Sequence, residues 1–171
     1  MSTRLTNGEV ADLLREWYAD CTEILKRNGA SIDKFIGDSV FAYWHRIDPE
    51  ARACAIEAAR ELRAAEANPT SPARLLVRDR YNIVLDCRIG IHIGQVAIGS
   101  MGKGINTAVG DAVNIAFRIE TLTRVVGRST LVSTAFLDGW DEGRRHFESC
   151  GSHYVKGQND PIEVFAPLAI F

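Results

Sequence analysis

The chain opens with apolar residues at helical spacing. From Val10 to Leu25 they recur every three or four positions, which is the period of one helix face. Thr6 and Glu9 stand before this run with the spacing of a capping box, in which each side chain bonds the backbone of the other residue. An Asn-Gly pair at 28–29, a frequent helix stop, follows it. The pattern predicts an amphipathic helix that starts after Thr6 and ends at this pair.

Two short runs with strand composition come next. Ser31 to Ile36 and Ser39 to Trp44 are rich in β-branched and aromatic residues, and Gly37-Asp38 between them is typical of a tight turn. The sequence therefore predicts a hairpin with the carboxylate of Asp38 at its tip. Lys34 stands four residues earlier on the incoming strand, and even spacing along a strand places two side chains on one face.

The remaining elements continue this mixture of helices and strands. We predict a helix from Asp48 through Glu66, broken by Asn68 to Pro72; strands over Tyr81 to Ile93 and Val96 to Ile98; helices over Ala112 to Leu122 and Ser133 to Trp140; and a closing hairpin of Ser152 to Val155 with Ile162 to Ala166. This order predicts an α+β sandwich with helices on one face, within a single domain over residues 1–171.

Composition narrows the function classes. The chain has 171 residues and a formal net charge of -2, so it lacks the positive electrostatic field that would attract nucleic acid. No apolar run approaches the ~20 residues that span a bilayer, and no signal peptide is recognisable, so we expect a cytoplasmic chain without a membrane segment. The scattered cysteines favour neither a zinc site nor a disulfide framework: Cys21, Cys54, Cys87 and Cys150.

Candidate chemistry rests on polar residues at strand and helix ends. Asp38 offers carboxylate oxygens to Mg²⁺, which usually completes its shell with substrate phosphates, although most Gly-Asp pairs are only turns. Lys34 alone is most often a solvated strand residue. Asn114 and Arg118 lie four apart on a predicted helix and share a face, where the guanidinium fork suits a phosphate. An exposed polar helix face explains that pair equally well.

Other chemistries find no support in the sequence. Gly102-Lys103 lacks the spacing of a phosphate-binding Walker A loop. The four histidines stand apart from any nucleophile motif, so a triad mechanism is not indicated. The sequence thus favours catalysis by positioning and charge over covalent catalysis.

Four separated motifs together resemble the class III nucleotidyl cyclases, the adenylate and guanylate cyclase family. They are Asp33 to Asp38, Arg88 to Gly94, Gly110 to Arg118 and Val155 to Gly157, in the family's order and rough separation. The resemblance extends from the first helix to Pro167. It implies a ferredoxin-like βαββαβ-type cyclase sandwich that works as a head-to-tail dimer, with active sites in the clefts between subunits.

The resemblance also implies site residues. Asp38 would be one of two carboxylates that hold the metal, with two Mg²⁺ or Mn²⁺ ions expected per site. The other residues would bind the nucleotide: Lys34 and Thr107 the purine, Asn114 the ribose, Arg118 the α-phosphate, and Lys156 the terminal phosphates.

The purine pair bears on the choice of substrate. A Lys ammonium only donates hydrogen bonds, which suits adenine N1, and a Thr hydroxyl can accept from the adenine amino group. ATP is therefore favoured, although the same hydroxyl can also donate and GTP stays open. The Lys34 and Thr107 pair resembles that of a bacterial-type subgroup of adenylate cyclases.

One departure from the family pattern concerns its first strand. The family carries an apolar strand ending in Phe-x-Asp-Ile before the first helix, and this sequence has no such match. We therefore expect the first core strand and the second metal carboxylate to be missing, with little or no activity from this chain alone. Three explanations stay open: the sequence is a fragment, its start is misplaced, or another segment fills the vacant place in the sheet. The apolar tail from Val164 to Phe171 is one candidate for that segment.

The leading hypothesis is an adenylate cyclase domain that converts ATP to cyclic AMP and pyrophosphate by two-metal-assisted attack of the 3′-hydroxyl on the α-phosphorus. The alternative is a non-catalytic, dimerising, nucleotide-binding regulatory partner of a complete cyclase chain, in a homodimer or heterodimer. An RNA-binding domain is disfavoured by the acidic net charge and because adjacent predicted strands lack paired exposed aromatic residues.

Overall fold

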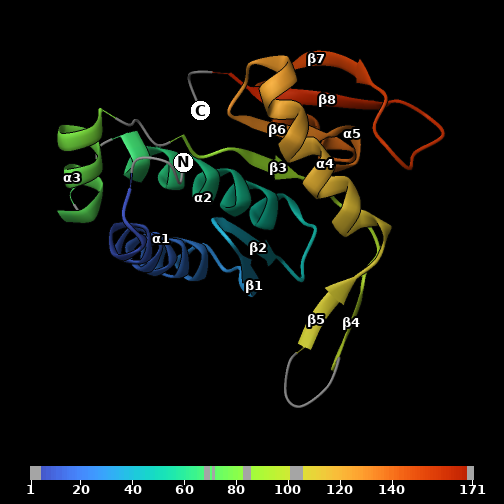
Figure 1. Cartoon of the computed structure of the whole chain (residues 1–171). Coiled ribbons are helices and arrows are strands. Elements are labelled where there is room, and N and C mark those ends of the chain that lie inside the picture. Colours follow the sequence, from blue (N-terminus) through green and yellow to red (C-terminus); the bar gives the residue numbers. More distant parts are fainter. Residues whose placement is uncertain (1–4, 68–69, 71, 83–85, 101–105, 169–171) are drawn as a thin grey trace. The chain divides into compact units, whose positions relative to one another are not determined.

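A computed structural model describes residues 5–67, 70, 72–82, 86–100 and 106–168 (Figure 1). The chain forms two compact units, one made of Met1–Arg46 with Cys54–Cys87 and the other of Ile47–Ala53 with Arg88–Phe171. Both contain helices and strands, which confirms the predicted α+β class. In the described part, no helix combines the length and the apolar character needed to cross a bilayer.

The first unit packs helices beside one hairpin. Its elements are α1 (Asn7–Arg27), β1 (Ser31–Ile36), β2 (Ser39–Tyr43), most of α2 (Pro49–Ala67) and α3 (Pro72–Tyr81). The predicted capping box at the start of α1 is confirmed, because the Thr6 backbone N–H donates to Glu9 Oε2 at 2.8 Å and the Glu9 N–H donates to Thr6 Oγ1 at 3.3 Å. Asn28 caps the other end of α1, as predicted.

The predicted hairpin is also confirmed. β1 and β2 pair antiparallel, and Ile36 lies opposite Ser39, so Gly37 and Asp38 alone form the turn. Gly37 has φ 60°, the left-handed conformation that the first central residue of a type II′ turn requires. The register shifts between Ile32 and Lys34, so the intervening residue forms a β-bulge.

The predicted strand over Tyr81 to Ile93 is wrong for much of its length. Tyr81 is the last residue of α3, a helix that the prediction omitted, and the strand β3 is only Ile89–Ile91; residues 83–85 lie outside the described part. Contacts with α1 stabilise α3, because buried Val77 packs with Leu13 and the Tyr81 hydroxyl donates to Glu9 Oε1 at 2.9 Å. Such tertiary contacts override local preference.

The second unit contains a four-stranded sheet in the order β3-β6-β8-β7. The strands β3 and β6 are parallel and the other neighbours antiparallel. A second pair of strands forms a hairpin that extends from this unit (Figure 1). Besides β3, the elements are β4 (Ala97–Ser100), β5 (Asn106–Val109), α4 (Asp111–Val126), β6 (Thr130–Ser133), α5 (Thr134–Leu137), α6 (Asp141–Arg144), β7 (Phe147–His153) and β8 (Ile162–Pro167).

Helix α4 packs on the four-stranded sheet. Its buried Ile119 and Leu122 join a core with Leu131 and Val164, so the predicted helix is confirmed and one apolar stripe of it faces the sheet. A Cβ on Gly90 of β3 would lie 2.3 Å from the Glu120 backbone nitrogen, so the helix approaches the strand closely enough that only glycine fits.

The start of α2 belongs to the second unit. Arg52 is buried there, and its guanidinium donates to the carbonyl oxygens of Phe136 at 2.8 Å and Asp138 at 2.7 Å. Asp48 caps this end of the predicted helix, since its Oδ1 accepts from the Ala51 N–H at 3.0 Å. The helix thus contributes residues to both units.

The predicted closing hairpin is confirmed as β7 and β8. It also shows whether the apolar tail could replace the missing first strand. Val164 to Pro167 are part of β8, which pairs with β6 on one edge and β7 on the other. This part of the tail therefore belongs to the closing hairpin and does not fill another place in the sheet. The missing first strand itself stays a prediction.

Candidate active site

The turn that carries Asp38 is held by two aromatic side chains of α1. The Trp17 indole N–H donates to the Asp38 carbonyl oxygen at 2.8 Å, and the Tyr18 hydroxyl donates to the Gly37 carbonyl oxygen. The Tyr18 ring also packs on Phe35 of β1, with centroids 4.2 Å apart. These bonds fix the backbone of the turn while the Asp38 side chain stays exposed. The carboxylate is thus available to a ligand.

Lys34 lies on the same hairpin and forms an ion pair with its neighbour in sequence. Its Nζ lies 3.0 Å from Asp33 Oδ2, and the Asp33 side chain is fully buried, whereas that of Lys34 is 42% exposed. Sequence reasoning missed Asp33 as part of this arrangement. Strict strand alternation would separate the two side chains, and only the bulge at Asp33 brings them together.

The second unit brings three of the predicted site residues into one pocket. Asn114 and Arg118 line it from successive turns of α4, and Lys156 lines it from the loop between β7 and β8. The pocket has a volume of about 170 Å³. The other lining residues, which the prediction omitted, are Asp111, Ile115, Gly157 and Gln158.

A tight turn presents Lys156 to this pocket. The Gln158 N–H donates to the Val155 carbonyl oxygen at 3.2 Å, so Lys156 and Gly157 are the two central residues. Gly157 has φ 84°, as the second central residue of a type II turn requires. Gly157 therefore has a structural role, because it creates the turn that exposes Lys156.

Thr107 lies on β5 opposite Gly99 of β4, and it is 8% exposed. Thr107 belongs to the second unit and Lys34 to the first. That Lys34 and Thr107 bind the same purine therefore stays a prediction.

His92 and Cys87 are two side chains of the kind used in covalent catalysis, and burial changes the pKa of each. His92 Nδ1 lies 2.8 Å from Ser133 Oγ, and burial lowers the pKa of its imidazole. Burial raises the pKa of the Cys87 thiol to about 12, so little of the nucleophilic thiolate exists near neutral pH. Among the described residues, no group of three or more His, Cys, Asp or Glu side chains is arranged to hold a metal ion.

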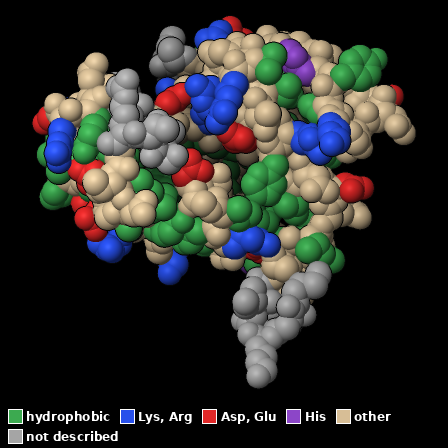
Figure 2. Space-filling view, viewed as in Figure 1, with side chains coloured by type: hydrophobic (Ala, Val, Ile, Leu, Met, Phe, Trp, Pro, Cys, Tyr) green, Lys and Arg blue, Asp and Glu red, His purple; other side chains and the backbone are tan. Residues whose placement is uncertain are grey.

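The distribution of charge agrees with a local binding site. On the face drawn in Figure 2, Lys and Arg side chains are interspersed with Asp and Glu side chains. The pocket combines two cations, Arg118 and Lys156, with one carboxylate, Asp111. This chemistry suits a single phosphate-bearing ligand better than a long polyanion.

The chain resembles known cyclases in sequence, although no family model matches it. It is 30% identical over 169 residues to "Adenylate cyclase 1" of Rhizobium meliloti (strain 1021), covering 95% of this chain and 24% of the relative. It is 31% identical over 137 residues to "Adenylate cyclase" of Anabaena cylindrica, covering 78% of this chain and 26% of the relative. The chain thus spans about a quarter of the length of these curated relatives.

Solved structures give the same result for the fold. A bacterial light-regulated adenylyl cyclase matches with a TM-score of 0.73 and 28% identity, over 96% of this chain and 80% of that structure. An adenylyl cyclase from P. aeruginosa matches with a TM-score of 0.79 and 21% identity, over 98% and 86% of the two chains. By sequence and by fold, the chain is recognised as a nucleotidyl cyclase catalytic domain of class III.

Proposed function

We propose that the chain is the catalytic domain of an adenylate cyclase, which converts ATP to cyclic AMP and pyrophosphate. The observation that carries this proposal is the pocket of the second unit, where Asn114, Arg118 and Lys156 come together from two separate segments. The similarity to relatives that are named adenylate cyclases supports the choice of ATP over GTP.

The pocket matches the parts of a nucleoside triphosphate. The guanidinium of Arg118 can bind two oxygens of the α-phosphate with its planar fork, and the ammonium of Lys156 suits the terminal phosphates. The Asn114 amide both donates and accepts hydrogen bonds, as a ribose hydroxyl does, so it can orient the sugar.

These residues act by positioning and by charge. In the proposed reaction the ribose 3′-hydroxyl gives its proton to water and its oxygen forms a bond to the α-phosphorus, while the bond from that phosphorus to the departing pyrophosphate breaks. Asn114 holds the attacking sugar in line, which lowers the entropic part of the barrier. Arg118 and Lys156 stabilise the negative charge on the α-phosphoryl group and on the pyrophosphate. No covalent nucleophile is needed.

A divalent cation fits the donor set of the hairpin tip. The exposed carboxylate of Asp38 is a hard oxygen ligand, and Mg²⁺ commonly takes one or two carboxylates and completes its shell with water and substrate phosphates. Mg²⁺ or Mn²⁺ bound there would supply positive charge for the phosphates. The second ion of the expected pair remains part of the proposal.

The purine and the partner subunit complete the proposal. Lys34 donates to adenine N1 and the Thr107 hydroxyl accepts from the adenine amino group. Two such domains form a head-to-tail homodimer or heterodimer, in which Asp38 serves one cleft and Lys34 the other. Residues 1–171 then act as one domain, which we place in the cytoplasm.

A product assay tests this function. Cyclic AMP and pyrophosphate are measured from ATP with Mg²⁺ or Mn²⁺, for residues 1–171 and for a longer version that includes upstream coding sequence. We expect little or no product from residues 1–171 alone and, from the longer version, equal amounts of both products and a lower rate with GTP. Arg118→Ala should lower the rate about 100-fold or more, the scale on which a charge-stabilising donor acts.

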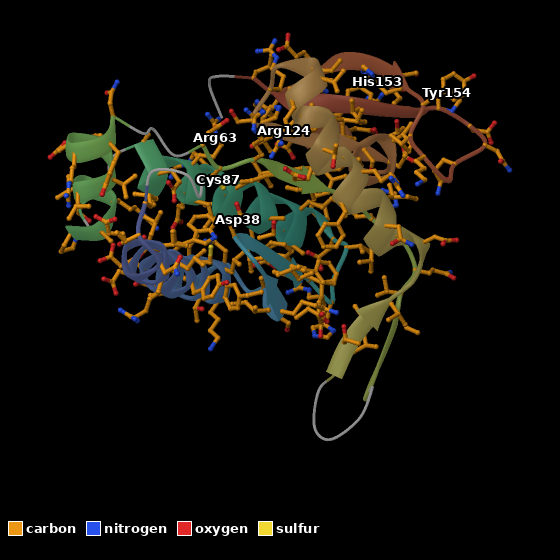
Figure 3. All side chains as sticks on the ribbon, viewed as in Figure 1. Asp38, Arg63, Cys87, Arg124, His153 and Tyr154 are labelled. Atoms are coloured by element: carbon orange, nitrogen blue, oxygen red, sulfur yellow. The ribbon has the colours of Figure 1, made fainter. Side chains whose placement is uncertain are left out.

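The control is Arg124→Ala, an exposed arginine on the same helix outside the pocket (Figure 3). Its rate should stay within about twofold of the unaltered protein, since surface substitutions have small effects. A folded, dimeric protein that binds ATP yet makes no cyclic AMP in either version would contradict the enzyme and favour the regulatory partner.

A further inference from the structure

The ion pair on the β1–β2 hairpin joins residues that a regular strand keeps apart. Adjacent side chains in a strand point to opposite faces. The register shift between Ile32 and Lys34 makes Asp33 the extra residue of a β-bulge, and its Oδ2 lies 3.0 Å from the Lys34 ammonium. Bulges commonly re-aim a side chain in this way.

Burial is divided unequally between the two partners. The Asp33 side chain is fully buried, whereas the Lys34 side chain is 42% exposed. A buried carboxylate needs compensation by positive charge and hydrogen bonds, so Lys34 is held towards Asp33. The rest of the lysine side chain is accessible to solvent.

An ammonium can serve more than one acceptor, because it carries three N–H bonds. A lysine that is already held in place loses less freedom when a ligand binds, which favours binding through pre-organisation.

We infer that Asp33 is the positioning residue for Lys34, holding its ammonium where it donates to the N1 acceptor of a purine. This inference rests on the proposed role of Lys34 in nucleotide recognition. Asp33 does not touch the nucleotide itself and acts through the lysine.

The test compares ATP with 1-deaza-ATP, which lacks the N1 acceptor. Their dissociation constants are measured by calorimetry with Mg²⁺. The unaltered protein should bind ATP about tenfold more tightly, as one charge-assisted hydrogen bond allows. Asp33→Asn and Lys34→Ala should each reduce this ratio to about twofold or less.

The matched control is Asp12→Asn, which breaks an exposed ion pair with Arg15 on α1 and should keep the tenfold ratio. A structural role for Asp33 predicts that Asp33→Asn weakens both nucleotides equally and leaves the ratio unchanged, which overturns the inference. Asp33→Glu keeps the charge and should retain more discrimination than Asp33→Asn, so it serves if the first variant folds poorly.

A second measurement needs no nucleotide. Acetylation of lysines with acetic anhydride, followed by mass spectrometry, compares Lys34 with exposed Lys26. Asp33→Asn should raise the relative labelling of Lys34 several-fold because the ion pair shields it. Unchanged labelling overturns the pairing. If labelling rises but the unaltered protein binds no nucleotide, the Asp33–Lys34 pairing stands. The proposed function then fails, and so does the role of Lys34 in binding the purine.

Discussion

The hairpin tip of the first unit and the pocket of the second unit differ in how they are built. The tip presents one carboxylate, Asp38, on a two-residue turn whose carbonyl groups are bonded to α1. The pocket gathers side chains from α4 and from a loop near residue 156. One region offers an oxygen ligand for a cation and the other offers cations for phosphate. In the proposed function the carboxylate serves the metal and the cations serve the phosphates.

The two regions also depend on different interactions. The tip needs a local turn and two hydrogen bonds, whereas the pocket needs α4 to lie close against β3. A substitution at the interface of helix and strand should therefore damage the pocket and leave the tip intact.

The largest effect on stability is expected at Gly90. In Gly90→Ala the new Cβ would lie 2.6 Å from the Ala116 carbonyl oxygen and closer still to the backbone of Glu120. We expect a loss of about 2–3 kcal/mol in the free energy of unfolding, typical of overpacking against rigid neighbours. Urea denaturation measures it. Gly99→Ala is the control, because its Cβ meets nothing within 4 Å, and a similar loss there would refute the packing argument.

A smaller effect is expected at the tip itself. Asp38→Asn should raise the Mg²⁺ concentration for half-maximal turnover about tenfold, because the site loses a charged ligand. The free energy of unfolding should change by less than about 0.5 kcal/mol, since the side chain is exposed. Asp12→Asn on α1 controls for loss of an acidic surface group, and an equal change in Mg²⁺ dependence there would argue against a metal role for Asp38.

The smallest effect on the Mg²⁺ requirement concerns the support of the turn. Trp17→Phe removes the indole donor to the Asp38 carbonyl and should cost about 1 kcal/mol of stability, the usual net value of one hydrogen bond. Trp44→Phe removes a similar bond to the Asn28 carbonyl, 2.7 Å long, elsewhere in the same unit. Only Trp17→Phe should also raise the Mg²⁺ requirement, by about twofold to threefold. Equal behaviour of the two variants in a Mg²⁺ titration would mean that the turn is not a ligand platform.

Local signals predicted the first unit's hairpin and the main helices well. The capping residues Thr6 and Glu9, the Gly37-Asp38 turn and the apolar stripe of α4 act within a few positions, so the sequence alone reveals them. Strand β6 escaped prediction because Thr130–Ser133 is a four-residue strand, buried at every position, with no alternation to reveal it. Helix α3 escaped because its stability depends on contacts with α1.

The residues of the candidate site also divide into those that local spacing predicts and those that depend on the tertiary structure. Asn114 and Arg118 are four residues apart, and their shared helix face follows from spacing. The approach of Lys156 to that face depends on the sheet, and the sequence suggested it only through the family resemblance. The pairing of Asp33 with Lys34 depends on a bulge that no periodicity signals.

The central claim, that the pocket of the second unit holds the triphosphate, is tested most directly by binding without turnover. The dissociation constant of 3′-deoxy-ATP, which lacks the attacking hydroxyl, is measured for the unaltered protein, for Arg118→Ala and for Arg124→Ala. Loss of the phosphate-binding guanidinium should weaken binding at least about tenfold, whereas Arg124→Ala should leave it unchanged. Equal affinities for all three proteins would contradict the assignment of the pocket.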